Sequence, residues 1–459
     1  MDCIFVNRRD ELGRLEAWWA QPGARLGVIW GRRRVGKTAL VAEFATRRRT
    51  VFHTGAGRPP AEELRLLSVA TAATIGDERL RDLHDRPFQD WREALETLAE
   101  AARNQPLLLI LDEFPDLVGA APALPGELRA LWDRFRARTQ LRILLCGSAV
   151  RTMRAMQQER APLYGRVDLS LLLHPFDPHD TALLLRGMEP PDRALVWGLL
   201  GGMPLYLSWW SPDDSVRENL LALVCSPGAQ LLNEGQLVLA TEVADGQLDA
   251  QVLRAIAIGR TKHGEIADAV RAEPTRALER LIELRLIERL VPVTEDPRRT
   301  RRRIYRIADN FLAFWLALVE PHRTEIERGL GRGVAAVIER SLDDHMGARF
   351  EEAFRIHLRR LAAAGVLGPE VVAIGPWWRD QPSVEIDAVA LSGRDRVATL
   401  VGEAQWTRAV DGRQLAARLR RGAEALPHAA DELTIAIAGR ESVHDAHGLL
   451  PVTAADIFA

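Results

Sequence analysis

The stretch LGVIWGRRRVGKT, residues 26–38, decides the fold of the first half of the chain. A short apolar run, Leu26–Trp30, leads into Gly31–Thr38, which fits the pattern G-x-x-x-x-G-K-[ST]. An amphipathic helical pattern follows at Thr38–Ala45. A strand, a glycine-rich turn and a helix in this order form a phosphate-binding loop, in which backbone amides and the positive end of the helix face the phosphates. The stretch therefore predicts an α/β domain that binds ATP.

Each residue type in the loop suits this chemistry. The glycines let the backbone approach the phosphates closely. Lys37 would reach the β- and γ-phosphate oxygens as a compact charge, and Thr38 would give a hydroxyl ligand to Mg²⁺. Only Lys37 and Lys262 interrupt an otherwise all-arginine set of basic residues, so a lysine in the loop stands out from the composition. The predicted nucleotide-binding residues are Gly31, Arg32, Arg33, Arg34, Val35, Gly36, Lys37 and Thr38.

Further apolar runs alternate with helical patterns through residue 175. The runs Val51–His53, Leu107–Leu111 and Ile143–Cys146 are typical of strands buried on both faces of a parallel sheet. Helical patterns such as Phe88–Ala102 lie between them. This order predicts a P-loop NTPase parallel sheet over residues 1–175.

Two acids, Asp112 and Glu113, end the run at 107–111. A strand that ends in carboxylates places them at the carboxyl edge of the sheet, beside the phosphates. Asp112 would hold Mg²⁺ through water, and Glu113 would act as general base on the attacking water. Paired acids at a strand end are also common in solvated turns, but behind a phosphate loop we interpret them as catalytic.

The order of the motifs resembles that of a known family. FVNRRDEL (5–12), the phosphate loop, LILDE (109–113), CGS (146–148), PLYGR (162–166) and GGMP (201–204) follow one another as in archaeal-type ATPases related to the AAA+/STAND group. The resemblance implies that Arg8 and Pro204 flank the adenine. It also implies that Ser148 is the first sensor, in contact with the γ-phosphate or the attacking water; a simple strand-ending turn is the alternative.

Arg166 follows the turn at 162–165. It would stabilise transition-state charge, either within its own chain or across to a neighbouring subunit of a homo-oligomer. In a chain with 61 Lys and Arg, a surface arginine without a catalytic role is the alternative. The predicted catalytic residues are therefore Lys37, Glu113, Ser148 and Arg166.

Length and composition are those of a globular protein with several domains. A chain of 459 residues suggests about two to four domains. The formal net charge of -2 gives no global attraction to nucleic acid or to a membrane. Cys3, Cys146 and Cys225 are scattered, which suits a reducing compartment. No signal-peptide pattern is present, and GGMP interrupts the uncharged stretch Ala194–Trp210, so we expect a cytoplasmic protein with no membrane partner.

A helical region and a candidate DNA-binding unit follow the ATPase core. Residues 176–245 predict a helical lid, and residues 246–308 resemble a winged helix-turn-helix. Its expected helices are Gln251–Ile258, His263–Val270 and Thr275–Leu284, and its strands Ile287–Pro292 and Arg303–Ile307. The predicted DNA contacts lie in the loop between those strands: Arg298, Arg299, Arg301, Arg302 and Arg303. A lid packed on the nucleotide domain, or a merely solvated loop, are the alternatives.

The last part of the chain predicts another α/β domain. A helical connector is expected at 309–345 and the α/β domain at 346–459. IYRIAD (304–309) and FLAFW (311–315) resemble the start of the domain of unknown function, DUF234, that follows such ATPases. That domain resembles the PD-(D/E)xK nuclease fold, so the resemblance implies a restriction-endonuclease-like core.

Acidic residues in this core suggest a second Mg²⁺ site. Glu403 and Gln405 are two apart on an expected strand and share a face, and a hairpin near 393–394 brings Asp387 beside them. Asp387 and Glu403 would hold Mg²⁺, and the resemblance adds Glu351 as a helical acid. Gln405 stands where the motif has lysine, and a neutral amide can only donate a hydrogen bond. These acids as surface residues of a hairpin are the alternative.

Three functions remain open from the sequence. The first is an ATP-driven enzyme that acts on DNA through the winged helix and the nuclease-like domain. The second is an ATP-dependent STAND-type signalling switch whose C-terminal domain is a catalytically dead interaction module. The third is an ATPase whose dead nuclease domain has a structural or DNA-binding role.

Overall fold

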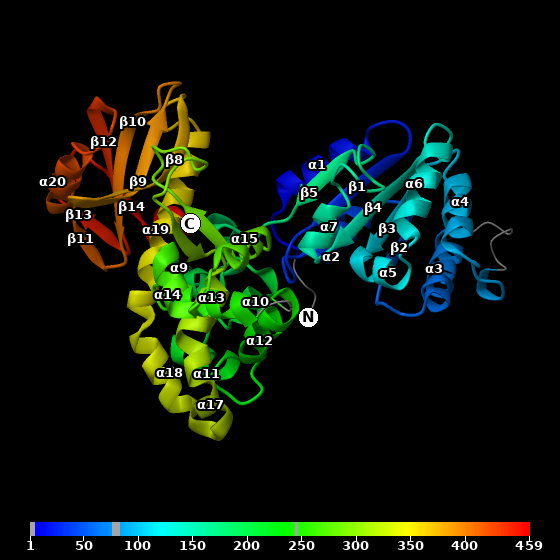
Figure 1. Ribbon diagram of the computed structural model, residues 1–459, viewed down its shortest axis with the longest axis horizontal. Helices are drawn as coiled ribbons and strands as arrows, with labels where there is room; N and C mark the ends of the chain where they lie inside the picture. The colour runs from blue at the N-terminus through cyan, green and yellow to red at the C-terminus, as the bar shows by residue number, and fades with distance from the viewer. Residues whose placement is uncertain (1–4, 76–82, 244–246) are drawn as a thin grey trace. The chain divides into compact units, whose positions relative to one another are not determined.

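The computed structural model describes residues 5–75, 83–243 and 247–459. The chain folds as two compact units, Met1–Pro175 and Phe176–Ala459, and Figure 1 labels most of their elements. Cys3 and the predicted boundary at residue 245 lie outside the described residues. In the part of the chain that is described, no helix is both long and apolar enough to cross a membrane.

A five-stranded parallel sheet in the order β2-β3-β4-β1-β5 forms the centre of the first unit (Figure 1). The strands are β1 (Arg25–Trp30), β2 (Thr50–Thr54), β3 (Leu107–Asp112), β4 (Leu141–Gly147) and β5 (Leu169–Leu172). All residues of β3 and β4 are buried, which explains their apolar runs. The predicted parallel α/β sheet is confirmed, and the structure adds the short edge strand β5.

Helices cover both faces of this sheet. They are α1 (Arg9–Trp19), α2 (Lys37–Ala45), α3 (Pro60–Ile75), α4 (Trp91–Ala101), α5 (Phe114–Ala120), α6 (Leu124–Phe135) and α7 (Val150–Ala155). Alternate strand residues, among them Leu109 and Ile143, share one core cluster with α3, α4 and α6. Helix α2 contacts β3 and β4 and contributes nothing to that cluster.

Helices also open the second unit: α8 (Pro178–Leu184), α9 (Pro190–Leu200), α10 (Pro204–Trp209), α11 (Val216–Leu223) and α12 (Gln230–Glu242). GGMP separates α9 from α10, as the sequence predicted. The break has a steric reason, because a Cβ on Gly202 would lie 1.8 Å from the Phe176 carbonyl oxygen.

Three helices and a two-stranded antiparallel sheet come next. They are α13 (Gln247–Ala257), α14 (His263–Val270), α15 (Thr275–Glu283), β6 (Ile287–Leu290) and β7 (Ile304–Ile307). Helix α13 contacts α14, α15 and β7. Arg280 of α15 donates from Nε to the buried Asp249 of α13 over 2.9 Å, which fixes two of the helices to each other.

An irregular helical segment leads to the last domain. It consists of α16 (Asn310–Phe314), the π-helical turn η2 (Trp315–Val319), the 3₁₀ turn η3 (Glu320–His322), α17 (Arg323–Glu325), the π-helical turn η4 (Ile326–Leu330) and α18 (Gly331–Arg340). Trp315 is almost fully buried and donates from its indole nitrogen to the Leu232 carbonyl. A side chain of this size packs η2 against α12.

A mixed five-stranded sheet, in the order β14-β12-β10-β9-β8, ends the chain (Figure 1). Its strands are β8 (Val371–Asp380), β9 (Ser383–Ser392), β10 (Val397–Gln405), β12 (Ala429–Gly439) and β14 (Leu450–Thr453); the short β11 (Ala409–Asp411) and β13 (Ser442–His444) pair apart, and α21 (Ala454–Ile457) closes the chain. Strands β8, β9 and β10 are antiparallel neighbours, whereas β10, β12 and β14 run parallel. Helix α19 (Leu342–Ala363) packs on one face and α20 (Gly412–Ala423) on the other.

Candidate functional site

The phosphate loop lies between β1 and α2, where the carboxyl ends of the parallel strands meet. Gly31 packs closely against the residue that follows β5, since a Cβ on Gly31 would lie 2.5 Å from the Leu173 carbonyl oxygen. Gly36 has φ 93°, a left-handed conformation that strains any other residue. Both glycines of the motif are therefore required by the backbone, before any role in phosphate binding.

Lys37 is buried and folds back over its own loop. Its Nζ donates to the carbonyl oxygens of Gly31 and Arg32, each at 3.0 Å. These bonds hold the ammonium group within the loop. A phosphate that enters the loop offers stronger, charged acceptors to the same three donors.

Thr38 and Asp112, the two predicted Mg²⁺ ligands of this site, lie together. Thr38 Oγ1 donates to Asp112 Oδ2 over 2.8 Å. Burial raises the pKa of the Asp112 carboxyl above its usual value, and the Thr38 hydrogen bond works in the opposite direction. The other carboxylate oxygen, Oδ1, is buried without a hydrogen-bond partner among the described residues. A buried acceptor left in this state fits a Mg²⁺-bound water, because Mg²⁺ keeps several waters and takes few protein ligands.

Glu113 follows immediately in a left-handed conformation, with φ 45°. A non-glycine residue rarely adopts this backbone, and such residues cluster at functional sites. Its Oε2 accepts hydrogen bonds from Ser148 Oγ at 2.9 Å and from the Ser148 amide at 3.3 Å. The structure thus brings together two of the predicted catalytic residues, from the ends of the adjacent strands β3 and β4.

Of the other predicted residues of the nucleotide site, Arg8 contacts the phosphate loop, Arg166 lies on the surface of the first unit, and Pro204 belongs to the second unit. Arg8 is buried, donates from Nη2 to the Val35 carbonyl over 2.9 Å, and pairs with Glu11 at 3.0 Å. It therefore contacts the phosphate loop itself. Arg166 makes a two-pronged contact with Asp133 of α6, at 2.9 and 2.8 Å, on the surface of the first unit. Pro204 is the first residue of α10 in the second unit.

Near this site lies a buried His–Glu pair that no sequence motif marks. His53 Nε2 lies 2.9 Å from Glu63 Oε2, and both side chains are almost inaccessible. Burial lowers the pKa of His53, although Glu63 opposes that shift. Glu63 Oε1 also accepts from the amides of Ala56 and Arg58, at 3.0 Å each. Glu63 therefore fixes the loop that follows β2, whose Gly55 amide donates to the Asp112 carbonyl.

The five arginines predicted to contact DNA have different surroundings. Arg298 and Arg299 are exposed, and Arg299 lies 3.6 Å from Asp296. Arg301 is exposed too. Arg302 forms an ion pair with Glu295 and donates to the Trp378 carbonyl of β8 over 3.0 Å; Arg303 donates to the Thr300 carbonyl over 2.8 Å. The loop is thus attached at one end to the C-terminal sheet, and its tip is solvated.

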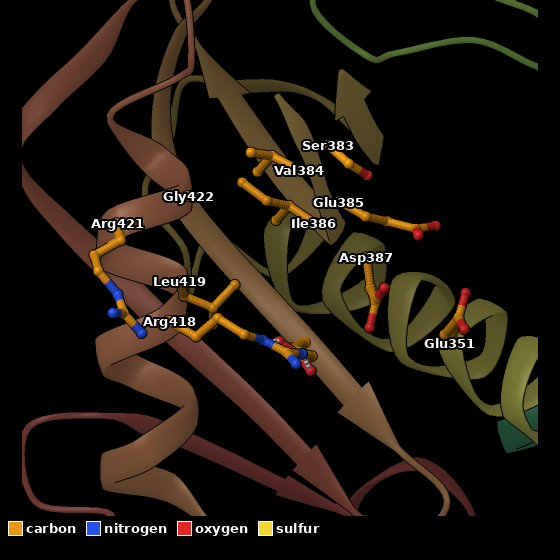
Figure 2. A pocket seen from close by; sticks show the side chains of 11 residues that line it. Glu351, Ser383, Val384, Glu385, Ile386, Asp387, Arg418, Leu419, Arg421 and Gly422 are labelled. Carbon is orange, nitrogen blue, oxygen red and sulfur yellow. Dashed lines mark hydrogen bonds and ion pairs between the residues drawn. The ribbon is translucent and has the colours of Figure 1, made fainter. Parts of the chain in front are cut away.

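The predicted acids of the C-terminal domain line one pocket of about 510 Å³, called here the carboxylate pocket. Its acidic members are Glu351, Glu385, Asp387 and Glu403, and Arg418 of α20 closes one side. Figure 2 shows Glu351 on α19 pointing toward Asp387 on β9. Gln405, which stands at the third position of the motif, lies beside Glu403: its Nε2 donates to Glu403 Oε1 over 3.0 Å.

The acids of this pocket differ in how they are balanced. Glu403 is buried and bonded to Arg418, whose Nε lies 3.1 Å from Oε2. Burial, and next to it the charge of Asp387, raises the pKa of Glu351 to about 7. Burial also raises the pKa of Asp387, and the Ala404 amide, 2.9 Å from its Oδ2, opposes that rise. The charge of Asp387 therefore disfavours ionisation of Glu351, which lies 3.7 Å from Arg355, whereas Glu403 is bonded to Arg418.

Across residues 5–75, 83–243 and 247–459, no set of three or more His, Cys, Asp or Glu side chains is placed to hold a metal ion. Glu351 and Asp387 would suit a hydrated Mg²⁺ bound through one or two carboxylates. Glu403, the third predicted ligand, instead faces Arg418. Sequence reasoning missed Arg418 because nothing in the linear pattern of α20 links it to β10.

Comparisons with known proteins agree with this architecture. Residues 5–209 match the family described as an ATPase domain predominantly from Archaea, and residues 315–416 match DUF234, Archaea bacterial proteins of unknown function. An uncharacterised protein of Methanocaldococcus jannaschii is 25% identical over 412 residues, 88% of each chain. An uncharacterised ATP-binding protein of the same organism is 51% identical over 41 residues, 9% of this chain and 70% of its own.

A solved structure shares the fold over most of the chain. The Walker-type ATPase of Pyrococcus abyssi superposes with a TM-score of 0.53 at 20% identity, and covers 68% of this chain and 96% of its own. An identity this low shows the fold alone. The two family matches follow the order predicted from the motifs: residues 5–209 match the archaeal ATPase domain, and residues 315–416 behind it match DUF234.

Proposed function

We propose that this ATPase hydrolyses ATP with Mg²⁺ at the Gly31–Thr38 loop and couples the reaction to DNA through its second unit. The observation that carries the hydrolytic part is the cluster at the ends of β3 and β4. There Thr38 donates a hydrogen bond to Asp112, the other Asp112 oxygen is buried with no hydrogen-bond partner in the described part of the chain, and Ser148 donates to Glu113. These are the groups that in-line attack of water on a γ-phosphate requires.

Each residue has a distinct task in this proposal. Lys37 exchanges its two carbonyl acceptors for phosphate oxygens and stabilises the charge that develops on them. Thr38 and Asp112 would hold Mg²⁺, which neutralises charge on the β- and γ-phosphates when bound. Glu113 takes the proton of the attacking water. Ser148 orients the Glu113 carboxylate through its hydroxyl and its amide.

Arg8 and Arg166 keep proposed roles of different kinds. Arg8 supports the loop through the Val35 carbonyl, close to the expected base end of the nucleotide. Arg166 would act on a transition state only after release from Asp133. An arginine held in this way on a surface suits a homo-oligomer, in which it reaches a neighbouring subunit's nucleotide.

The test of the hydrolytic proposal is Lys37→Ala. We expect loss of ATP turnover, because no other cation of the loop can fill the same depth. Arg47→Ala is the matched control, since Arg47 is exposed beyond the other end of α2 and loses an equal charge. Turnover at the wild-type rate in Lys37→Ala would remove the phosphate loop from the mechanism.

Support for the DNA part comes from the second unit. Helices α13–α15 with the β6–β7 hairpin have the element order of a winged helix-turn-helix, and the hairpin loop carries five arginines within six residues. The nuclease-like part of the proposal is supported by the element order α19, β8–β9–β10, the short β11, α20 and β12, which is compatible with the helix, three strands, helix and strand expected of a PD-(D/E)xK core. DNA-stimulated ATP hydrolysis, combined with gel-monitored nicking in Mg²⁺, tests both appended parts. An ATPase rate that is the same with and without DNA would show that neither part couples DNA to ATP hydrolysis.

A second function is favoured by one observation in the carboxylate pocket. Arg418 and Gln405 both bond to Glu403, so one acid of the nuclease-like triad already has protein partners. In this alternative the chain is a STAND-type, ATP-dependent signalling switch whose C-terminal domain is a catalytically dead interaction module. Mg²⁺-dependent nicking that is lost in Asp387→Ala would reject it, whereas nicking that persists in Asp387→Ala comes from another site.

A further inference from the structure

A second pocket in the Phe176–Ala459 unit, of about 580 Å³, has the opposite charge to the carboxylate pocket. It is called here the basic pocket. Three segments meet in it: the start of α14, the residues that precede and open β7, and the end of β8. Its polar and charged members are Lys262, His263, Arg301, Arg302, Arg303 and Asp380.

The cations of the basic pocket are only partly balanced. Lys262 Nζ lies 3.3 Å from Asp380, and Arg302 is paired with Glu295. Arg303 donates only to a backbone carbonyl. Among the residues that the structure describes, the Arg301 guanidinium takes part in no hydrogen bond or ion pair. Two of the four cations, Lys262 and Arg302, have carboxylate partners, so the pocket has an excess of positive charge at Arg301 and Arg303 that an anion would neutralise.

The basic pocket and the carboxylate pocket share one hairpin. Trp378, which lines the basic pocket, is the direct cross-strand partner of Glu385, which lines the carboxylate pocket. Residues opposite each other on antiparallel strands lie about 5 Å apart at Cβ, on the same face. Asp380 and Ser383 repeat this relation at the end of the hairpin. The two pockets are therefore neighbours along β8 and β9.

We infer that the basic pocket binds the phosphodiester backbone of DNA and places the bound strand beside the carboxylate pocket. The inference rests on the proposed DNA role and makes it specific. The contact is assigned to Lys262 at the start of α14 and to Arg301 and Arg303 at the base of the hairpin loop, not to Arg298 and Arg299 at its solvated tip. Arg302 is a structural member, because its bonds to Glu295 and the Trp378 carbonyl hold the loop on β8.

The arrangement of the cations in the basic pocket suits a phosphodiester backbone. Cations from two separate segments face one space, and the amino end of the eight-residue α14 adds its partial positive charge. A continuous backbone presents a phosphate at regular intervals, so it can meet Lys262 and Arg301 together. A free phosphate or a mononucleotide has the same chemistry but extends no further, so the experiment must separate these sources.

The test measures binding of a fluorescein-labelled duplex of about 20 base pairs over a salt series, by fluorescence anisotropy of the full chain in EDTA. Each lost phosphate contact lowers the slope of log K against log salt by about 0.9. Lys262→Ala/Arg301→Ala should therefore reduce the slope by about 1.8. Arg332→Ala/Arg340→Ala removes two exposed cations from α18, outside both pockets, and should leave the slope unchanged.

Gain-of-binding variants exclude simple misfolding. Asp380→Asn removes the one carboxylate of the basic pocket and should tighten duplex binding several-fold. Glu385→Gln should do the same in EDTA, because a strand beside the carboxylate pocket is repelled by that charge. No change in Glu385→Gln would overturn the placement of the strand, and no change in Asp380→Asn would overturn the pocket as the binding site.

The outcomes separate the inference from the proposed function. A wild-type slope in Lys262→Ala/Arg301→Ala, with a reduced slope in Arg298→Ala/Arg299→Ala, would reject the basic pocket and keep a DNA-binding loop. Absence of duplex binding by the wild-type chain would reject the DNA role altogether. Displacement of the duplex by inorganic phosphate at matched ionic strength would show a small-anion site and overturn the inference.

Discussion

Replacement of Glu113 by glutamine tests the proposed chemistry at a single atom. The side chain keeps its length, and its amide oxygen can still accept the hydrogen bonds that Oε2 receives from Ser148 Oγ and the Ser148 amide. The left-handed backbone at φ 45° is equally available to glutamine. ATP binding should survive, because Lys37, Thr38 and Asp112 are untouched. Only the capacity to take a proton is lost.

The expected loss follows from that change. A positioned general base contributes about 10² to 10⁴ in rate, which corresponds to about 3–5 kcal/mol in the activation barrier. The effect should be confined to kcat, because the interaction with the water proton forms in the transition state. Ser148→Ala should cost less, since it removes one of two bonds to Glu113 and leaves the base in place.

The assay is phosphate release at saturating ATP, combined with the ATP dissociation constant measured by calorimetry. Lys37→Ala serves as the contrasting variant, because it should lose affinity as well as turnover. If Glu113→Gln binds ATP normally and turns it over within tenfold of the wild-type rate, Glu113 is not the base. The left-handed turn would then serve only to begin α5.

Three further outcomes follow from particular contacts. Thr38→Ala should raise the Mg²⁺ concentration needed for half-maximal ATPase activity by at least about tenfold, because it removes one proposed ligand and leaves Asp112 without its bond; an unchanged requirement would exclude Thr38. The pKa of Glu351 is raised to about 7 from 4.5, so the folded chain holds an extra proton between these values and loses stability as pH rises through them. Denaturant unfolding of Glu351→Gln should therefore lack that share of the pH dependence, and equal profiles for variant and wild type would contradict the assignment. Gly235→Ala should destabilise the second unit by about 3 kcal/mol, because its Cβ would lie 2.3 Å from the Trp315 ring. The control Gly333→Ala has open space around the new Cβ, so it should be neutral or stabilising by about 0.5–1 kcal/mol. Equal melting temperatures for the two variants would refute the packing of Trp315 against α12.

The nucleotide-binding half could be predicted from sequence because its determinants are local. The run at 26–38 specifies a strand, a turn and a helix within thirteen consecutive residues, and β3 ends directly in Asp112-Glu113. Parallel strands then bring the ends of β1, β3 and β4 to one edge without further information. The Glu113–Ser148 contact follows from this geometry, although their separation in sequence hides it.

What could not be predicted depends on contacts between distant segments. Glu63 and His53 form a buried pair that no linear pattern marks. The π-helical turn at Trp315–Val319 arises where a large indole must fit against α12. Arg418 lies on helix α20, fifteen residues after Glu403, and donates to that acid on β10. In each case the partner is chosen by tertiary packing, which overrides local preference.

The charge balance of the carboxylate pocket decides how Gln405 should be interpreted. Its neutral amide leaves the third motif position without a cation, but Arg418 supplies one from α20 and bonds to the same Glu403. Burial and then the charge of Asp387 raise the pKa of Glu351, although Arg355 lies 3.7 Å from it and opposes the rise; burial also raises the pKa of Asp387. Half-buried acids whose charged forms are disfavoured in this way cluster at functional sites. A cation bound beside Glu351 and Asp387 would therefore stabilise their charged forms, whereas Arg418 already balances the charge of Glu403.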